Sequence, residues 1–411
     1  MTNTTETPVA TSFSDLGVAD DIVEELASQG ITTPFPIQEL TLRDAMAGVD
    51  ITGKAQTGSG KTLAFGIPMI TKVGASDSKK PHGLILVPTR ELAGQVTKTL
   101  EPLLRVRNLT AVAVYGGAPM GPQIDALNNG ASIAIATPGR LIDLLERKAI
   151  DPREISIVTI DEADQMADMG FMPQVRRIMA QLPDERQTFL YSATLDHQVR
   201  ELIDRYMNDP VVYEVESESE TVDTMEHRFL KVHYLDKAKL VTELSRHNDR
   251  ILAFTRTKAG ADRLARDLKE LDVQGAAIHG DLPQAKREQS LQRFSDGDIK
   301  VLVATNVAAR GLHIDGVDVV VHYDPPDDPK TYLHRSGRTA RAGEDGLVVT
   351  LVEWDQVNEV LGIQRRAELN VPIVKMFSND ERLADLASWE PPIEEAPFSA
   401  KSIKKRKRRG F

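Results

Sequence analysis

Short apolar runs alternate with amphipathic stretches along most of the chain. In the first half the runs are DITGKA, HGLILVPT, TAVAVYGG, ASIAIATP, ISIVTIDE and QTFLYSAT. Stretches with helical periodicity lie between them, such as residues 63–73 and 170–182. Strands that are apolar on both faces and spaced for crossover helices predict a parallel sheet covered by helices.

The same pattern starts again in the second half, after the acidic and Ser-rich stretch EVESESETVDTMEH, which has no periodicity and indicates a linker. The second set of runs is HRFLKVHY, RILAFTRT, VQGAAIHG, IKVLVATN, VDVVVHYD and GLVVTLV. We therefore predict an α/β protein with two tandem parallel-sheet domains. The expected parts are a disordered N-terminus at 1–12, a first domain at 13–215, a linker at 216–225, a second domain at 226–375 and a mobile tail at 376–411.

Composition agrees with a globular protein of this size. The 411 residues are 41% apolar and 27% charged, and none is cysteine, which excludes disulfides and thiolate metal sites. The first residues lack the basic and apolar regions of a signal peptide, and no apolar run approaches the roughly 18 residues of a membrane span. We expect a cytoplasmic protein, and a monomer because no apolar dimerisation segment stands out.

Charge is distributed unevenly along the chain. The net charge is −11, yet the last segment, KSIKKRKRRGF, carries seven of the 50 Lys and Arg residues and no acid. The rest of the chain therefore repels polyanions, and a nucleic acid partner has to meet a local basic groove and backbone amides. The tail itself has two open interpretations, a solvated disordered segment or a nonspecific arm that grips RNA.

The segment AQTGSGKT follows an apolar strand and leads into the helical stretch TLAFGIPMI. Glycines let successive amides point at phosphate oxygens, and the helix N-terminus adds partial positive charge. Lys61 is then expected to reach the outer phosphates of a nucleotide, and the Thr62 hydroxyl to bind Mg²⁺. The alternative is a Gly-rich turn that happens to precede a lysine.

Two carboxylates end the apolar run ISIVTI. Asp161 is expected to face the metal and Glu162 to polarise a water near the γ-phosphate. Acids at such a position are often helix caps, but the phosphate loop favours the metal interpretation.

Seven motifs in this order resemble the DEAD-box ATP-dependent RNA helicases of superfamily 2. They are AQTGSGKT, PTRELA, TPGR, DEAD, SAT, ATNVAARG and HRSGRTAR, and the resemblance covers about residues 13–350. It implies two RecA-like domains, ATP and Mg²⁺ as cofactors, and RNA gripped through its backbone without sequence preference.

The resemblance also implies roles for individual residues. In the ATP site, the adenine is read by Gln38 and stacked by Phe13, and the phosphates are held by Thr57, Gly58, Ser59, Gly60, Lys61 and Thr62. Thr62 and Asp161 hold the metal. The catalytic set is Lys61, Asp161, Glu162, His334, Arg338 and Arg341, in which Glu162 is the general base, the two arginines act as fingers and His334 bridges the domains. Arginine fingers on the second domain make hydrolysis depend on closure.

RNA contacts and coupling residues are implied in the same way. The RNA set is Thr89, Arg90, Gly116, Gly117, Thr137, Gly139, Arg140, Gln284, Arg287, Thr305 and Arg310. Ser192, Thr194 and Asp164 couple the nucleotide state to RNA separation. Small residues at loop tips suit contacts with phosphates and 2′-hydroxyls, which carry no base sequence.

Some positions depart from the family pattern. Phe35 stands where Thr or Ser is usual, and Ile31 replaces an aromatic. Asn306 replaces an Asp, His313 in ARGLHID replaces another Asp, and Ala340 replaces a glycine. Phe35, Asn306 and His313 bear on adenine and ribose recognition rather than on the phosphate chemistry.

The expected function is RNA-stimulated ATP hydrolysis coupled to local, non-processive unwinding of short RNA duplexes or to remodelling of RNA–protein complexes, ribosomal or in RNA decay. The sequence leaves open a DNA translocase of the same superfamily, a non-catalytic ATP-dependent RNA clamp, and RNA affinity that resides mainly in the basic tail. Single-stranded DNA as an activator would favour the translocase, because only RNA offers the 2′-hydroxyl.

Overall fold

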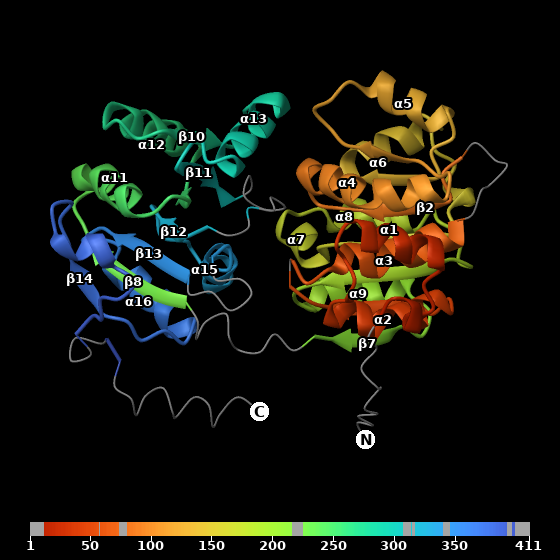
Figure 1. Ribbon diagram of the computed structural model, residues 1–411, viewed down its shortest axis with the longest axis horizontal. Helices are drawn as coiled ribbons and strands as arrows, with labels where there is room; N and C mark the ends of the chain where they lie inside the picture. Colours follow the sequence, from red (N-terminus) through yellow and green to blue (C-terminus); the bar gives the residue numbers. More distant parts are fainter. Residues whose placement is uncertain are drawn as a thin grey trace. The chain divides into compact units, whose positions relative to one another are not determined.

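The computed structural model describes residues 12–56, 58–73, 80–215, 225–306, 314, 317–339, 346–392 and 397–398. The chain forms two compact units, which divide between Ser217 and Glu218. Each unit contains one parallel sheet with helices on both faces (Figure 1). The predicted α/β class is confirmed.

The first unit is built on a seven-stranded sheet in the order β3-β4-β2-β5-β6-β1-β7. Its strands are β1 (Ile51–Lys54), β2 (Gly83–Leu86), β3 (Ala111–Val114), β4 (Ile133–Ala136), β5 (Ile157–Ile160), β6 (Gln187–Ser192) and β7 (Val211–Glu214). Its helices are α1 (Asp20–Ser28), α2 (Pro36–Met46), α3 (Lys61–Val73), α4 (Arg90–Val106), α5 (Met120–Asn128), α6 (Pro138–Glu146), α7 (Ala163–Asp168), α8 (Met172–Met179) and α9 (His197–Tyr206).

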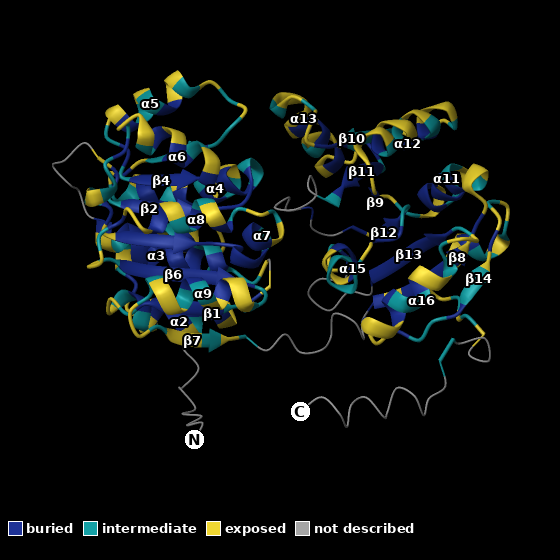
Figure 2. Ribbon diagram, turned by 180° about the vertical axis from the view of Figure 1, so that it is seen from behind, coloured by how far each residue is buried: buried dark blue, intermediate teal, exposed yellow. Residues whose placement is uncertain are grey.

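Alternation along the strands divides the apolar side chains of this sheet between two cores. Ile85 packs in one core with residues of α1 to α4, whereas Leu84 and Leu86 pack in the other with residues of α5 to α9. Successive side chains of a strand point to opposite faces, so a central strand that is covered on both faces is apolar at most positions. Figure 2 shows these strands buried beneath the helices.

The second unit repeats the design with a sheet in the order β10-β11-β9-β12-β13-β8-β14. Its strands are β8 (Met225–Lys231), β9 (Ile251–Thr255), β10 (Gly275–Ile278), β11 (Val301–Thr305), β12 (Val319–His322), β13 (Gly346–Val352) and β14 (Ile373–Lys375). Its helices are α11 (Lys237–His247), α12 (Lys258–Glu270), α13 (Gln284–Ser295), α15 (Pro329–Ser336) and α16 (Val357–Arg366).

The sequence predicted six strands per unit, and the structure adds the edge strands β7 and β14. Val211 and Val212 of β7 are exposed, and β14 has only three residues. Met225, which the sequence placed at the end of the linker, is the first residue of β8.

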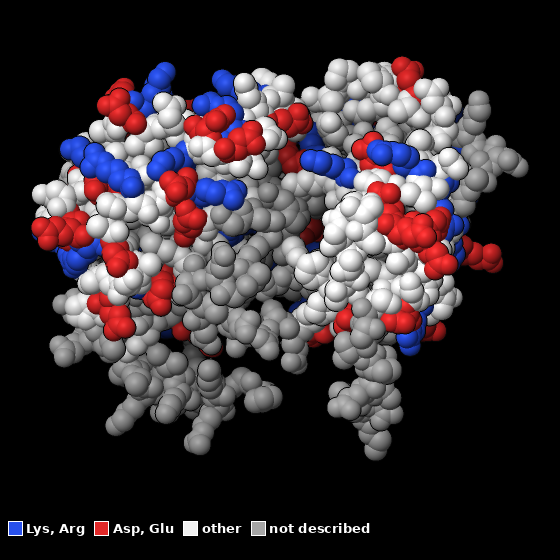
Figure 3. All heavy atoms as spheres, viewed as in Figure 1, with Lys and Arg blue, Asp and Glu red and all other residues white. Residues whose placement is uncertain are grey.

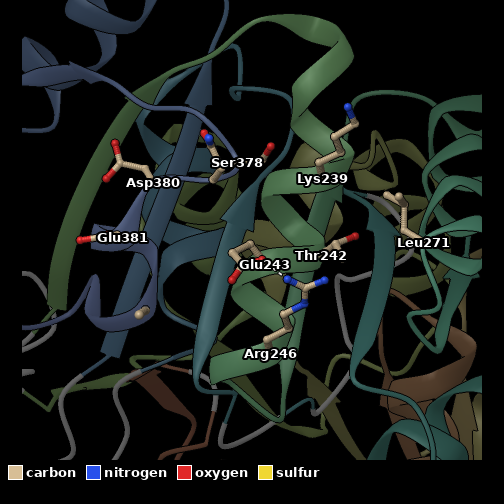
Figure 4. A pocket seen from close by; sticks show the side chains of 10 residues that line it. Lys239, Thr242, Glu243, Arg246, Leu271, Ser378, Asp380 and Glu381 are labelled. Atoms are coloured by element: carbon tan, nitrogen blue, oxygen red, sulfur yellow. Dashed lines mark hydrogen bonds and ion pairs between the residues drawn. The ribbon is translucent and has the colours of Figure 1, made fainter.

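The second unit also extends past residue 375, where the sequence expected a mobile tail to begin. Met376, Leu383 and Leu386 are buried in the core beside α11, and Arg228 donates to the carbonyl of Leu386 at 3.0 Å. Figure 4 shows Ser378, Asp380 and Glu381 across a pocket of about 510 Å³ from α11. Residues 376–389 therefore belong to the folded unit.

None of the described helices has the length and apolar character needed to cross a membrane.

Candidate active site

The loop between β1 and α3 makes the tight turn that the phosphate-loop interpretation requires. Gly58 and Gly60 have φ of +86° and +87°, in the left-handed region that side chains with a Cβ avoid. The Ser59 hydroxyl closes the turn by donating to the Gln56 carbonyl at 2.7 Å. The loop leads into the N-terminus of α3, where partial positive charge favours an anion.

The first side chain of α3 forms a buried ion pair. Lys61 is 5% exposed, and its Nζ donates to Glu162 Oε1 at 2.8 Å and to the Ala55 carbonyl at 3.2 Å. Burial alone would lower the pKa of Lys61, but the carboxylates of Glu162 and Asp161 outweigh burial and raise that pKa. Lys61 is therefore a full cation held against the acid that the sequence proposed as general base.

The two acids follow β5 directly. Asp161 is 2% exposed and its Oδ1 accepts the Glu162 N–H at 3.0 Å. Glu162 has φ of +53°, which is unusual for a residue with a side chain, and it precedes α7. Strained backbone of this kind concentrates at functional sites.

A third acid ties the end of β5 to the end of β6. The Asp164 N–H donates to Ser192 Oγ at 3.1 Å, and Asp164 Oδ2 accepts from the Thr194 hydroxyl at 3.3 Å. Ser192 in turn donates to the Thr194 carbonyl at 2.8 Å. The structure thus joins all three residues that the sequence grouped as coupling residues.

Sheet topology explains why these groups meet. In the first sheet β6 pairs with β1 on one side and β5 on the other, and all three strands are parallel. The carboxyl ends of parallel strands lie at one edge, where open sheets bind ligands. Lys61, Glu162 and Ser192 are far apart in the sequence, but they share that edge of the sheet.

The two residues expected to bind the adenine are both buried. Phe13 is 1% exposed and packs in the core with residues of α1 to α4. Gln38 is 0% exposed, with Oε1 accepting the Phe35 N–H at 2.9 Å and Nε2 donating to the Gly60 carbonyl at 2.8 Å. Its amide therefore holds the phosphate loop against α2 in this structure.

The predicted RNA residues of the first unit gather at the other half of the same edge, after the neighbouring strands β2, β3 and β4. Arg90 donates to the Gly116 carbonyl at 3.4 Å, and Arg140 donates to the Ala118 carbonyl at 3.1 Å. Both arginines thus hold the loop that contains Gly117, with Thr89 capping α4 and Thr137 at the start of α6. Gly139 is exposed beside them.

The second unit places its predicted residues on several elements. Gln284 and Arg287 lie on α13, and Arg287 is buried. Thr305 ends β11, His334 is exposed on α15, and Arg338 follows that helix. Thr57, Arg310 and Arg341 lie outside the described residues, as do His313, Ala340 and the basic segment from Lys401.

Arg335 is a residue that the sequence analysis did not single out. It is 4% exposed, and its guanidinium donates to Asn306 Oδ1 at 2.5 Å and to the Asp324 carbonyl at 2.9 Å. Burial lowers the pKa of Arg335 to about 10, although the carboxylate of Asp324 opposes that shift. This arginine links the loop after β11 to α15. The sequence feature that could have identified it is its position in the HRSGR motif.

Mg²⁺ fits the donor set at the end of β5. Among the described residues, no cluster of three or more His, Cys, Asp or Glu could hold a metal by itself. Mg²⁺ commonly binds one or two protein oxygens together with substrate phosphates and waters. Asp161 and the Thr62 hydroxyl would suit an ion that arrives with a nucleotide.

Two family models match the chain, and each falls within one of the units. The model described as DEAD/DEAH box helicase matches residues 35–202, and the helicase conserved C-terminal domain matches residues 231–343. A curated relative, DEAD-box ATP-dependent RNA helicase CshA of Geobacillus kaustophilus, is 38% identical over 91% of this chain and 80% of its own length. The chain belongs to the DEAD-box ATP-dependent RNA helicase family.

Other relatives of this DEAD-box protein are longer than it is. The Arabidopsis thaliana relative, DEAD-box ATP-dependent RNA helicase 9, mitochondrial, is 40% identical over 86% of this chain but only 59% of its own length. The Listeria monocytogenes relative CshA is 41% identical over 84% of this chain and 66% of its own.

Solved structures confirm the tandem RecA-like fold of this family. A structure of S. cerevisiae Dbp5 bound to RNA and ADP BeF3 has a TM-score of 0.78 at 30% identity, with 90% of this chain and 97% of that chain covered. A DEAD box protein from Methanococcus jannaschii has a TM-score of 0.51 at 31% identity, with 89% and 99% covered.

Proposed function

We propose that this DEAD-box protein is an RNA-stimulated ATPase that separates short RNA duplexes locally or remodels RNA–protein complexes, without sliding along many base pairs. The observation that supports it most is the buried ion pair between Lys61 and Glu162 at the end of β5. It brings a phosphate-binding cation and a carboxylate base together at one sheet edge.

The ion pair suggests how nucleotide binding switches on the base. With Lys61 on Glu162, the carboxylate is neutralised and is a poor proton acceptor. The outer phosphates of ATP attract Lys61 more strongly than a single carboxylate does, because they carry more charge. Glu162 would then be able to accept a proton from the attacking water, and Asp161 and Thr62 would hold Mg²⁺. Bound Mg²⁺ would supply charge neutralisation at the phosphates.

The second unit is proposed to complete the catalytic set. Arg338 and Arg341 would stabilise charge at the γ-phosphate, and His334 would connect the two halves once ATP and RNA are bound. An arginine finger is worth about a thousandfold or more in turnover, which makes hydrolysis depend on RNA. Ser192, Thr194 and Asp164 would transmit the nucleotide state to the RNA-binding loops.

RNA binding through local backbone contacts suits the surface charge. Figure 3 shows Lys and Arg interleaved with Asp and Glu on the face in view. The exposed Gly139 and the loop at Gly116 and Gly117 would let phosphates and 2′-hydroxyls approach backbone amides. We further propose a monomer that acts in the cytoplasm; the Arabidopsis relative is named a mitochondrial protein.

ATP turnover with and without RNA tests the assignment. In Glu162→Gln we expect RNA-stimulated turnover to fall at least about a hundredfold with ATP binding retained, because a general base typically contributes 10²- to 10⁴-fold. Arg338→Ala and Arg341→Ala should lose most of the RNA stimulation.

The matched control is Glu146→Gln, which changes a remote carboxylate that is about half exposed. Wild-type rates in all three site variants would refute the proposal. Equal stimulation by single-stranded DNA would point to a DNA translocase instead.

A further inference from the structure

Four large apolar side chains are exposed at one end of the second sheet. They follow β13, β8 and β14, which are parallel neighbours with Lys231 of β8 level with Val352 of β13 and Lys375 of β14 (Figure 1). Because the carboxyl ends of these strands meet at one edge, segments far apart in the sequence come together there. We call the four side chains the aromatic edge: Tyr234 at 60%, Leu235 at 66%, Trp354 at 77% and Phe377 at 52% exposure.

Hydrogen bonds hold the three segments against one another. The short helix η3 (Tyr234–Asp236) carries two of the side chains, and its last carboxylate accepts from the N–H and the hydroxyl of Ser378, each at 2.8 Å. Lys237, directly after this helix, donates to Glu353 Oε1 at 3.1 Å. Ser378 and Glu353 each neighbour one of the exposed rings in the sequence. The aromatic edge is therefore a surface that the fold holds in place.

Such exposure is not general in this unit. Among its described residues, Leu333 is the only other large apolar side chain that is exposed. In the first unit the corresponding strands β1 and β6 lead into the phosphate loop and the segment after Ser192. A concentrated apolar patch on a folded surface typically marks a binding site. The second unit thus displays aromatic rings where the first has its proposed nucleotide site.

Lysines without a carboxylate partner lie around the aromatic edge. Lys375 Nζ is 4.8 Å from the centre of the Phe377 ring, and Lys239 lines the same pocket as Ser378 (Figure 4). Neither these two lysines nor the exposed Lys231 forms an ion pair within the described part of the chain.

The acids at this edge are partly engaged. The Asp236 carboxylate is bound by Ser378 and that of Glu353 by Lys237, whereas Asp355 next to Trp354 is exposed. Bases stack on aromatic rings, and phosphates attract ammonium groups. Rings surrounded by unpaired lysines therefore suit single-stranded nucleic acid better than an uncharged apolar partner.

We propose that the aromatic edge is a second site for single-stranded RNA, in which bases stack on the rings and Lys231, Lys239 and Lys375 meet the phosphates. The RNA residues proposed above for this unit lie elsewhere, since α13 packs beside β10 and β11 at the other end of the sheet. β11 and β13 are three places apart, about 14 Å at the usual strand spacing. The inference rests on RNA as the ligand of the proposed function. It adds a site that needs no nucleotide, because it lies on one unit.

RNA binding by the full chain without nucleotide tests this. Fluorescence anisotropy would follow a labelled oligouridylate of about 20 nucleotides, long enough for several stacked bases. Trp354→Ala should weaken binding by about fivefold to a hundredfold, the usual effect of losing one stacked base. Trp354→Phe should keep the affinity within about threefold, because it keeps a ring.

Tyr234 and Leu235 provide the matched control, because they are neighbours in η3 with similar exposure. Tyr234→Ala should weaken RNA binding by about fivefold or more, whereas Leu235→Ala should leave it unchanged, since an aliphatic side chain offers no π-face. In Trp389→Phe, which leaves Trp354 as the only tryptophan, RNA should quench the remaining emission.

Three other outcomes would overturn the proposal. Unchanged affinity in both Trp354→Ala and Tyr234→Ala would exclude stacking, and equal losses in Tyr234→Ala and Leu235→Ala would indicate a general apolar contact. Self-association of the wild type in sedimentation, lost in Leu235→Ala as well as in Trp354→Ala, would assign the edge to a second copy of the chain. If the wild type bound no RNA with or without ATP, the proposed function would fail too. RNA-stimulated ATP turnover in a wild type whose edge variants bind RNA normally would leave that function intact.

Discussion

The two units share one topology, and the comparison separates what belongs to the fold from what belongs to the chemistry. Adding seven to each strand number of the first sheet gives the order of the second. In both units the helix after the first strand begins with a buried lysine, Lys61 in α3 and Lys237 in α11. Lys61 pairs with Glu162 after β5, and Lys237 pairs with Asp324 after the corresponding strand β12. A lysine–carboxylate pair across these strand ends is thus common to both units.

The difference lies in the connecting loop and in the number of partners. The first unit has Gly58 and Gly60 in left-handed conformations before its lysine. The second has VHYLD, without glycine, so successive amides are not arranged around an anion. Lys237 also has a second carboxylate, Glu353 at 3.1 Å, and lies 4.4 Å from the centre of the Tyr323 ring. A buried lysine at this place in the fold is therefore not sufficient to mark a phosphate site; in the proposed site the glycine loop and a single carboxylate partner, Glu162, distinguish Lys61 from Lys237.

The largest expected effect comes from removing the lysine of the first unit. Lys61→Met should lower RNA-stimulated ATP turnover about a thousandfold, about 4 kcal/mol, because the outer phosphates lose their cation. Lys72→Met on the same helix is the matched control; its ammonium contacts Gln187 instead. Steady-state phosphate release measures both. Equal losses of turnover in the two variants would contradict a phosphate-binding role that is specific to Lys61.

A smaller effect of a different kind is expected from the lysine of the second unit. Lys237→Met leaves two carboxylates without their cation and should lower the free energy of unfolding of that unit by about 3 kcal/mol. This is the low end for a broken buried pair, because the side chains of Asp324 and Glu353 are 26% and 27% exposed. Hydrogen exchange at β8 and β12 measures it.

The exposed Lys239 on the same helix is the control for that experiment, and Lys239→Met should change the free energy of unfolding by less than about 0.5 kcal/mol. Tripolyphosphate affinity should be unchanged in Lys237→Met. A weakened affinity would mean that Lys237 also serves a phosphate site.

The sequence was sufficient for the central strands, and it singled out Lys61 and Glu162, which the structure places in contact. The reasons are physical. Central strands such as β5 and β12 are apolar at three of their four positions because both faces are buried, so they stand out as runs. The edge strand β7 is largely exposed and lacks that signal. Lys237 sits in no recognisable motif, and its partners lie 87 and 116 residues away. Burial of Phe13 and exposure of Trp354 are likewise properties of packing that a local pattern does not contain.

The smallest expected effect is on pH dependence, and it too should divide the units. The last residue of β5 is Ile160, whereas the last residue of β12 is the buried His322, beside Arg335. Nδ1 of His227 on β8 shares a hydrogen bond of 2.8 Å with the Tyr332 hydroxyl. Burial lowers the pKa of His227 to about 4, with Glu226 opposing and Arg228 adding to the shift. Burial also lowers the pKa of His322, with contributions from Arg335 and His227.

A histidine whose pKa is lowered on folding stabilises the folded state fully above its unfolded pKa of about 6.5, and this stability is lost as the pH falls towards the folded value. From His227 alone, the second unit should lose about 2 kcal/mol between pH 7 and pH 5. Hydrogen exchange, corrected for intrinsic rates, should therefore show weaker protection of β8 and β12 at pH 5, with β1 and β5 much less affected. His322→Ile, which copies the first unit at this position, should remove the part of the dependence that comes from His322 and leave the part from His227. Equal acid sensitivity of both units would show that the buried histidines are not its source.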